Sequence, residues 1–363
     1  MSSIWGKYFT VDIFGESHGS KIGVVLNGLP SGVQLDLDRI QAFMDRRRAG
    51  SEAWTTSRRE PDKLNIVSGF FEGRTTGTPL CMMIDNTDTR SADYDTGLNR
   101  PGHADYSGSE RYGGFNDPRG SGHFSGRLTA PLVFAGAVAA QIVSASGVFA
   151  ATHIERIADV QDKRFDAVTV DKAVADKLAA MRFPLIDASL QQGMQQRVID
   201  AAETDNSVGG VIECAVVGLP AGLGSPMTQG VESRLTSLLF SIPAIKGVEF
   251  GDGFGLTAMT GSEANDEYEK KGSRIVTTTN HNGGILGGIT TGMPVVFRAA
   301  VKPTSSIALP QKTVNLKTGK AQTLKVQGRH DPCIVPRAVA VVEAAAYISM
   351  LDLMLERSAN HGI

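Results

Sequence analysis

The same succession of short motifs occurs twice along the chain, and this repetition constrains the fold more than any other feature. Gly-Leu-Pro-Ser-Gly at 28–32 reappears as Gly-Leu-Pro-Ala-Gly at 218–222, each time after an apolar, strand-like run. Gly-Arg-Thr-Thr-Gly-Thr-Pro at 73–79 reappears as Gly-Ile-Thr-Thr-Gly-Met-Pro at 288–294, each time before another such run. Each motif alone is an ordinary turn signal. Because both recur in the same order, we predict two structurally related halves.

The two halves also share a long, alanine-rich, helix-like run, near Ser125 to Val143 in the first and near Val335 to Leu355 in the second. Alanine allows helices to approach closely, so we expect these two helices at central, buried positions. We predict one domain over 1–363, with halves at about 1–150 and 205–363. A helical insert at about 151–204, helical from about Asp171 to Thr204, is expected between the halves.

Composition excludes several classes of protein. A formal net charge of −2 gives no global basic surface for nucleic acid, so any anion site must be a local arginine cluster. The most apolar stretch, roughly Ala130 to Val143, is too short to span a bilayer, and no signal-peptide pattern is present. Three widely spaced cysteines, Cys81, Cys214 and Cys333, indicate a reducing compartment and match no zinc-ligand spacing. We expect a cytoplasmic protein that binds no metal, nucleic acid or membrane.

Histidines in glycine-rich or basic loops are the main chemical signal. Five of the seven histidines lie in such segments: His18, His103, His123, His281 and His330. Histidine titrates near neutral pH and is the most frequent proton-transfer side chain, while glycine lets the backbone approach a ligand. Arginines beside three of these histidines indicate an anionic ligand. The loops together predict one polar pocket that moves protons.

The segment at 15–19 has two interpretations. It matches the G-x-S-x-G elbow of serine hydrolases, in which Ser17 would be the nucleophile. That elbow requires a helix after the turn, whereas 21–26 has the pattern of a strand. We therefore interpret His18 as an acid–base group or an anion donor, and keep the hydrolase as an alternative.

An arginine run at 46–48 also has two interpretations. Cations at the end of a predicted helix complement its dipole, which is a structural role. Three in succession, followed by Arg58 and Arg59, also suit a phosphate or carboxylate. Because no Walker A or G-x-G-x-x-G pattern is present, a nucleoside-triphosphate or Rossmann enzyme is disfavoured.

Segments along nearly the whole chain resemble the chorismate synthase family. They lie at 14–19 (Phe-Gly-Glu-Ser-His-Gly), 46–48, 55–62, 68–73, 86–88, 100–106 (Arg-Pro-Gly-His-Ala-Asp-Tyr), 246–251, 283–288, 302–306 (Lys-Pro-Thr-Ser-Ser) and 328–333 (Gly-Arg-His-Asp-Pro-Cys). The resemblance implies an α+β fold, a β-α-β sandwich of two pseudo-symmetric halves around central helices. It implies a carbon–oxygen lyase of the shikimate pathway of aromatic amino-acid biosynthesis. The reaction would be 1,4-anti elimination of phosphate from 5-enolpyruvylshikimate 3-phosphate, giving chorismate, with reduced FMN and no net redox change.

The resemblance also implies roles for individual residues. His18 would be the general acid or stabiliser of the leaving phosphate. His103 would protonate or tune the reduced flavin, and Asp331 would assist removal of the C6 proton. The residues that would hold substrate are Arg47, Arg48, Arg100, Arg127 and Arg329. The residues that would contact the cofactor are His103, Ser125, Ala244, Gly287, Lys302, Pro303, Thr304, Ser305, Ser306 and Arg329.

The sequence departs from the pattern of the family in three places. Its usual Arg-Ser-Ser-Ala-Arg-Glu-Thr reads His-Phe-Ser-Gly-Arg-Leu-Thr at 123–129, Pro243 replaces an asparagine, and Ala53 replaces an arginine. We therefore expect a variant subgroup in which His123 or Phe124 still lines the flavin site.

The resemblance implies a homotetramer and associates the family with NADP. No spare segment is long enough for a flavin-reductase domain, so reduced flavin is expected from an external reductase or reductant. Besides the hydrolase, a flavin-binding or carrier protein without lyase activity is the remaining alternative.

Overall fold

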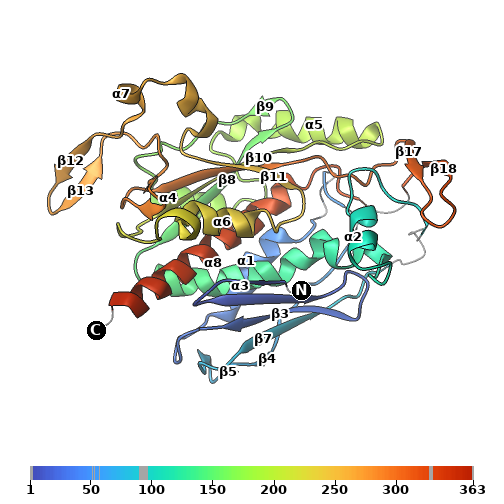
Figure 1. Cartoon of the computed structure of the whole chain (residues 1–363), viewed down its shortest axis with the longest axis horizontal. Helices are drawn as coiled ribbons and strands as arrows, with labels where there is room; N and C mark the ends of the chain where they lie inside the picture. The colour runs from blue at the N-terminus through green and yellow to red at the C-terminus, as the bar shows by residue number, and fades with distance from the viewer. Residues whose placement is uncertain are drawn as a thin grey trace.

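The computed structural model describes residues 3–50, 52, 54–56, 58–89, 97–326 and 330–361. Two five-stranded sheets enclose a layer of helices, so the predicted α+β sandwich with central helices is confirmed (Figure 1). The central layer holds α1 (Leu37–Arg47), α3 (Thr129–Ser144) and α8 (Val335–His361). The two alanine-rich helices α3 and α8 pack on each other so closely that a Cβ at Gly136 would lie 2.2 Å from the Ala344 Cβ. Small side chains therefore permit this central pair.

All strand pairs in the two large sheets are antiparallel. The first sheet has the order β1-β2-β3-β7-β4, with bounds Ile4–Trp5, Thr10–Gly15, Lys21–Asn27, Leu80–Asp85 and Asn65–Ser68. The second has the order β11-β16-β10-β8-β9, with bounds Ile245–Phe250, Val295–Val301, Gly210–Val217, Phe149–Ile157 and Val160–Gln161. Four strands correspond in sequence order and position, since β2-β3-β7-β4 in one sheet matches β8-β10-β16-β11 in the other.

The repeated motifs make the same contacts in both halves. Thr75 Oγ1 donates to the Pro30 carbonyl at 2.6 Å, and Thr290 Oγ1 donates to the Pro220 carbonyl at 2.7 Å. In return, the Gly32 N–H donates to the Thr75 carbonyl at 2.7 Å. The Gly222 N–H does the same to the Thr290 carbonyl at 2.9 Å. These matched turns support the prediction of two related halves.

The predicted place of the helical insert is wrong. Residues 151–157 belong to strand β8 of the second sheet, and the helices α4 (Lys172–Ala179) and α5 (Gln191–Glu203) follow that strand. The insert therefore interrupts the second half after its first strand instead of separating the halves. The strand is hard to recognise because it carries His153 and Glu155, both buried in the fold. The His153 ring is 2.9 Å from a Glu213 carboxylate oxygen on the neighbouring strand, which explains how a charged group occupies this position.

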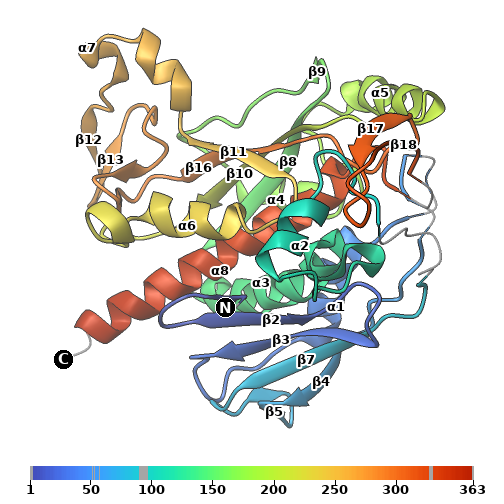
Figure 2. The same cartoon turned by 45° about the vertical axis from the view of Figure 1, so that its right-hand side comes forward.

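The remaining elements lie around the sandwich, and among them α6 packs against α8 (Figure 2). The helices and 3-10 turns are α2 (Asp105–Arg111), η2 (Arg119–Phe124), η3 (Gly126–Leu128), η4 (Ala188–Leu190), η5 (Met227–Gln229), α6 (Val231–Leu239), η6 (Gly253–Ala258) and α7 (Gly261–Ala264). The hairpins are β5–β6 (Phe70–Phe71, Arg74–Thr75), β12–β13 (Tyr268–Lys271, Arg274–Thr277), β14–β15 (Ile285–Leu286, Ile289–Thr290) and β17–β18 (Gln311–Val314, Ala321–Leu324). One end carries α7 with β12–β13, and the other carries α2 with β17–β18.

Two helical stretches, Gly126–Ser144 and Val335–Asn360, are long and apolar enough to cross a membrane by length and composition. Burial inside the protein covers 78% and 89% of their most apolar windows, as expected for core helices. The apolar run that the sequence indicated, roughly Ala130 to Val143, is shorter than the helical stretch Gly126–Ser144 in the structure. Length alone therefore does not exclude a membrane span for this stretch. Its burial, and not its length, assigns it to the core.

Candidate functional site

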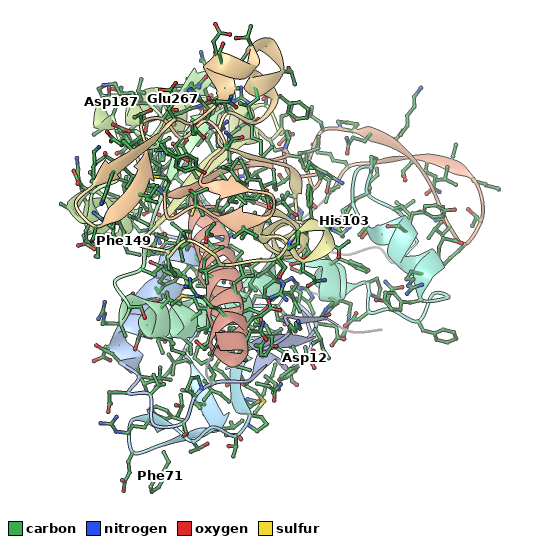
Figure 3. The ribbon with its side chains drawn as sticks, turned by 60° about the vertical axis from the view of Figure 1, so that its left-hand side comes forward. Asp12, Phe71, His103, Phe149, Asp187 and Glu267 are labelled. Carbon is green, nitrogen blue, oxygen red and sulfur yellow. The ribbon has the colours of Figure 1, made fainter. Side chains whose placement is uncertain are left out.

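Loops from both halves converge near the N-terminal ends of the central helices. The His103 ring lies between the two sheet layers, away from Phe71 at the outer edge of the first sheet (Figure 3). His103 follows β7 in the first half, and Asp331 follows β16 in the second. The two helix N-termini that meet here, those of α3 and α8, favour negatively charged ligands.

The His103 loop is organised by one carboxylate. Asp105 Oδ1 lies 2.6 Å from His103 Nδ1 and accepts from Arg100 Nη2 at 2.7 Å. The same guanidinium donates to the hydroxyls of Ser306 and Ser121, at 3.1 and 3.0 Å. Arg100 is buried. The loop at 100–105 is thus joined to η2 and to the predicted cofactor segment at 302–306.

The predicted cofactor segment at 302–306 touches both halves. Lys302 Nζ donates to the Gly102 carbonyl at 3.0 Å, and a Cβ on Gly102 would lie 3.5 Å from the Ser305 Cβ. Thr304 Oγ1 donates to the Asp331 carbonyl at 2.9 Å. The structure therefore brings His103, Asp331 and the Lys-Pro-Thr-Ser-Ser segment together. Pro303 lies inside this segment.

Asp331 is held by two donors on its carboxylate. Oδ1 accepts from the Thr56 N–H at 3.0 Å, and Oδ2 accepts from Arg337 Nη1 at 2.5 Å. Arg337 belongs to the first turn of α8 and also donates through Nε to the Arg47 carbonyl at 2.9 Å. The carboxylate is therefore fixed between the segment at 54–56 and the central helix.

Two of the predicted substrate arginines share one buried carboxylate. Arg47 Nη2 donates to Asp62 Oδ2 at 2.5 Å, and Arg127 Nη1 donates to Asp62 Oδ1. Asp62 is fully buried. Burial would raise the pKa of Asp62, but the two guanidinium groups outweigh burial and lower it. Burial also lowers the pKa of Arg47 to about 10. One carboxylate and two guanidinium groups leave this cluster with one net positive charge.

Arg48 lies at the edge of the site. Its Nε donates to the Glu60 carbonyl at 3.1 Å, and its Nη1 pairs with Asp45 at 2.9 Å. Its side chain is 37% exposed, whereas Arg47 and Arg127 are buried. Of these three arginines, Arg48 is the one most open to an incoming anion.

The ring of His18 packs against the backbone of η2. A Cβ on Gly120 would lie 2.4 Å from His18 Nε2, and Gly120 has a φ of 58°, a left-handed conformation that suits glycine. Burial lowers the pKa of His18, and the nearby cations Arg58 and Arg119 lower it further. His18 therefore favours the neutral imidazole until an anion arrives to stabilise its charged form.

Ser17 does not have the environment of a hydrolase nucleophile. Its turn leads from β2 into β3 and not into a helix. Its Oγ accepts from Arg58 Nη1 at 3.0 Å, and Arg58 Nη2 donates to its carbonyl at 3.2 Å. A guanidinium has no lone pair with which to remove the serine proton. These contacts disfavour the serine hydrolase.

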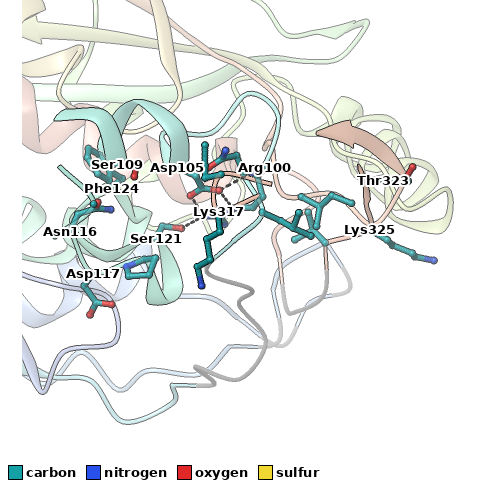
Figure 4. A pocket seen from close by; sticks show the side chains of 17 residues that line it. Arg100, Asp105, Ser109, Asn116, Asp117, Ser121, Phe124, Lys317, Thr323 and Lys325 are labelled. Carbon is teal, nitrogen blue, oxygen red and sulfur yellow. Dashed lines mark hydrogen bonds and ion pairs between the residues drawn. The ribbon is translucent and has the colours of Figure 1, made fainter. Parts of the chain in front are cut away.

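A cavity of 520 Å³ adjoins the His103 loop (Figure 4). Its lining comes from η2, α2 and the β17–β18 hairpin, and includes Arg100, Asp105, Ser121, Phe124 and Lys317. Volumes of about 300–1,000 Å³ are usual for small-molecule pockets. Polar and charged residues make up most of the lining, and Phe124 is its one aromatic side chain among the described residues, so the cavity suits a ligand with polar edges.

The two departures at 123 and 124 have different surroundings. Phe124 lines the cavity and packs against Tyr112, with ring centroids 6.3 Å apart. The ring of His123 instead lies 2.9 Å from the Gly15 carbonyl through Nδ1 and 2.6 Å from Ser3 Oγ through Nε2. Both ring nitrogens thus already have partners. Only Phe124 of this pair faces the cavity.

Of the other predicted site residues, some lie at the site, one lies away from it, and some fall outside the described residues. Ser125 caps η3 by accepting from the Arg127 N–H at 3.2 Å. Ala244, with a φ of 74°, accepts from the Lys302 N–H at 2.9 Å and so adjoins the site. Gly287 is not brought to the site, since its hairpin bonds to the turn at 222–224, at the opposite end of the seven-residue β16, roughly 20 Å away. Arg329 and Ala53 lie outside the described residues.

The sequence pointed to Arg58 as a residue that suits an anion, but not to Asp62 or Arg337 as site residues. Asp62 lies in the family-like segment at 55–62, so a charged residue inside that segment was the available signal. Arg337 had no comparable signal, because its role depends on the first turn of α8 reaching Asp331. Among the residues that the structure describes, no group of three or more His, Cys, Asp or Glu side chains is arranged to hold a metal, so no metal step is derived.

Comparisons with known proteins agree with this geometry. A family model described as chorismate synthase matches residues 9–355. A chorismate synthase of Dehalococcoides mccartyi is 44% identical over 357 residues, covering 98% of this chain and 97% of that protein. One of Thermococcus kodakarensis is 42% identical over 361 residues, covering 99% of both. A crystal structure of chorismate synthase superposes with a TM-score of 0.75 at 26% identity, covering 97% of this chain and 93% of that one.

Proposed function

The chain belongs to the chorismate synthase family, a family of lyases that act on a phosphate-bearing substrate, and on that premise we propose its reaction in detail. The substrate is 5-enolpyruvylshikimate 3-phosphate, and 1,4-anti elimination of phosphate gives chorismate with reduced FMN and no net redox change. The observation that carries the proposal is the contact of the His103 loop and the Asp331 loop with one segment, Lys302–Ser306. Loops that carry proton-transfer groups from both halves are thereby joined to one segment.

Positive charge at the site suits the substrate, which carries two carboxylates and a phosphate. The Asp62 cluster contributes one net positive charge, whereas the nearby Arg48 and Arg58 are paired with Asp45 and Glu60. Guanidinium groups bind such anions through paired, charge-assisted hydrogen bonds. Arg47 and Arg127 would act mainly by charge, because Asp62 already occupies part of each guanidinium, while Arg48 is open to direct contact.

The residues near the cavity fit a flavin. The segment at 302–306 offers one ammonium and three hydroxyls, and Ala244 adjoins it. The cavity beside Arg100 and Phe124 has room for part of the ring system, an aromatic side chain to pack on it and polar groups for its edges. When bound, the reduced flavin would lend electron density to a substrate whose C6 proton is only weakly acidic.

The chain's own residues would position the substrate and move its protons. His18, neutral in the free protein, would bind or protonate the leaving phosphate, whose negative charge favours the imidazolium form. Asp331 would assist removal of the C6 proton, and its two donors fix the carboxylate in place. His103 would hold or donate a proton beside the flavin.

The decisive test is anaerobic release of inorganic phosphate from 5-enolpyruvylshikimate 3-phosphate. We expect release and chorismate formation with reduced FMN, and neither with oxidised FMN. A well-folded sample that binds FMN but releases no phosphate would support the flavin-carrier alternative instead. Ser17→Ala tests the hydrolase separately, because it would abolish hydrolysis if Ser17 were a nucleophile.

Substitutions of His123 and Phe124, the two residues that replace the family's arginine and serine, test the location of the flavin site. Phe124→Ala is expected to weaken FMN binding by about tenfold, since it removes an apolar wall of the cavity. His123→Ala serves as the matched variant and should change FMN affinity by less, because its ring nitrogens contact Gly15 and Ser3. Unchanged affinity in both variants would place the flavin elsewhere.

The remaining expectations belong to the same proposal. The enzyme would act in the cytoplasm as a homotetramer, with reduced flavin from an external reductase or reductant that uses NADPH. Size measurement in solution tests the tetramer, and coupling to a separate flavin reductase tests the source of reduced flavin.

A further inference from the structure

We propose that Asp105 is a positioning residue that fixes the tautomer and orientation of His103 and makes Arg100 part of the same unit. The inference deepens the proposed function and rests on it for the role of His103. Although Asp105 lines the cavity, it would affect the reaction only through His103. It would act by holding the proton of His103 on Nδ1, so that Nε2 is the ring atom available to a ligand.

The geometry around Asp105 carries the first step. Its Oδ1 lies 2.6 Å from His103 Nδ1, closer than Arg100 Nη2, which lies 3.1 Å from the same ring nitrogen. The two hydrogens of Arg100 Nη2 are directed at Asp105 Oδ1 and Ser121 Oγ, so Nδ1 is not needed as their acceptor. An ionised carboxylate has no proton to donate, so the hydrogen in this contact must belong to Nδ1. In neutral His103 the lone pair is then on Nε2, and in charged His103 Nε2 carries the second proton.

The carboxylate is kept ionised by its surroundings. Burial would raise the pKa of Asp105, but hydrogen bonds from Arg100 and His103 outweigh burial and lower it. Three donors of Arg100 reach this carboxylate, namely the backbone N–H at 2.9 Å, Nε at 2.8 Å and Nη2 at 2.7 Å. A buried carboxylate with this many donors keeps both its charge and its place.

The contacts of Arg100 carry the second step. Its guanidinium donates to Asp105 through two nitrogens and to Ser306 and Ser121 through the terminal ones. Most of its N–H groups thus point at the protein, and its exposed fraction is 8%. We therefore assign Arg100 to the support of His103 and of the cofactor segment, in place of the direct substrate contact that the resemblance implied.

A purely structural role for Asp105 is the competing explanation. Asp105 is the first residue of α2, and a negative charge in a first helical turn is stabilising by itself. That role would lower stability on substitution but would leave the His103 tautomer unchanged. The tautomer is therefore the measurement that separates the two explanations.

The experiment uses the full-length protein labelled with 15N at histidine only. Asp105→Asn preserves the shape of the side chain but allows its amide to donate to Nδ1, and Asp105→Glu preserves the charge. The control is Asp159→Asn, which breaks an exposed pair with Arg197, at 2.6 and 3.0 Å, and is not among the described partners of His103 or Arg100. The His103 signals are identified by their loss in His103→Gln.

The expected result begins with the nitrogen spectra, recorded in solution alkaline enough to neutralise the ring. Nδ1 of His103 carries the proton in the wild-type protein, in Asp105→Glu and in Asp159→Asn, and loses it to Nε2 in Asp105→Asn. Turnover falls about 10²- to 10⁴-fold in Asp105→Asn with little change in KM, as expected when a catalytic imidazole takes the wrong tautomer. Asp105→Glu recovers part of that loss, and Asp159→Asn turns over at the wild-type rate.

Two outcomes overturn the proposal: a wild-type His103 protonated on Nε2, or full turnover in Asp105→Asn. The spectra do not depend on catalysis. If the wild-type protein released no phosphate, the proposed function would fail while the tautomer assignment was still decided.

Discussion

The two halves of the molecule share a framework and differ in their loops. Their sheets have the same strand order, and their paired turns make the same hydrogen bonds. The connection from the first helix to the next strand is long in the first half, at 48–64, and short in the second, at 240–244. The long connection carries Arg58, Glu60 and Asp62 into the site. The two halves therefore share a framework, and the first half adds charged residues to the site through its longer loop.

A second pair of loops is used by both halves. The connection from β7 to α3 carries His103, and the matching connection from β16 to α8 carries Asp331. They meet where Arg100 donates to Ser306 at 3.1 Å. Loops supported by a rigid scaffold are where functional residues concentrate. The proposed proton-transfer groups thus come from corresponding places in the two halves.

The largest expected effect is a loss of turnover, and it tests whether both halves supply proton-transfer groups. His18→Ala in the first half and Asp331→Ala in the second should each lower turnover by about 10²- to 10⁴-fold, the range for loss of a proton-transfer group. Single-turnover assays under anaerobic conditions measure it, and FMN binding should persist in both variants. A near-wild-type rate in either variant would remove that residue from the mechanism and leave the chemistry to one half.

Removing the buried carboxylate of the long loop should cost stability. Asp62→Ala leaves Arg47 and Arg127 buried without their counter-charge, which is expected to lower the free energy of unfolding by about 3–5 kcal/mol. Denaturant unfolding measures the change.

The matched control for Asp62 is Asp45→Ala, whose partner Arg48 is 37% exposed. An exposed ion pair of this kind contributes about 0–1 kcal/mol. Equal losses in the two variants would contradict the view that Asp62 organises the site from within the core.

The shared framework predicts equal effects from a matched pair of substitutions. Thr75→Val and Thr290→Val each remove a hydroxyl that donates to a proline carbonyl. The same hydroxyl accepts from the Val33 N–H in one half and the Leu223 N–H in the other. Each change should lower the free energy of unfolding by about 1–3 kcal/mol, because buried polar groups lose their partners. Losses that differ by more than about 1 kcal/mol would show that the turns are alike in geometry but not in energy.

The repeated framework and the segments that form the site could be predicted from the sequence. The contacts that assemble those segments into one site could not. Turn motifs and alanine-rich runs are local signals, so the repetition and the central helices were readable. Strand β8 was missed because His153 and Glu155 interrupt its apolar pattern, and only tertiary ion pairs explain their burial. The roles of Asp62 and Arg337 depend on contacts between distant segments, which no local pattern records. The position of Gly287 shows the limit of a residue-by-residue resemblance.

The smallest expected effect concerns the buried His153, at a position peculiar to the second sheet. Burial would lower the pKa of His153, but Asp162 and Glu213 outweigh burial and raise it above the usual 6.5. Its charged form is thus favoured in the folded state, so its contribution to stability is complete below the unfolded pKa, near 6.5, and is lost as pH rises through the folded pKa. Denaturant unfolding across that interval should show stability declining with pH in the wild-type protein and declining less in His153→Gln. Because Arg298 lies 3.6 Å from Glu213 and already offsets part of its charge, the decline should be modest. If the free energy of unfolding declined identically with pH in both proteins, its pH dependence would arise from groups other than His153. The buried charges around His153 would then contribute no more to that dependence than the apolar framework that the two sheets share.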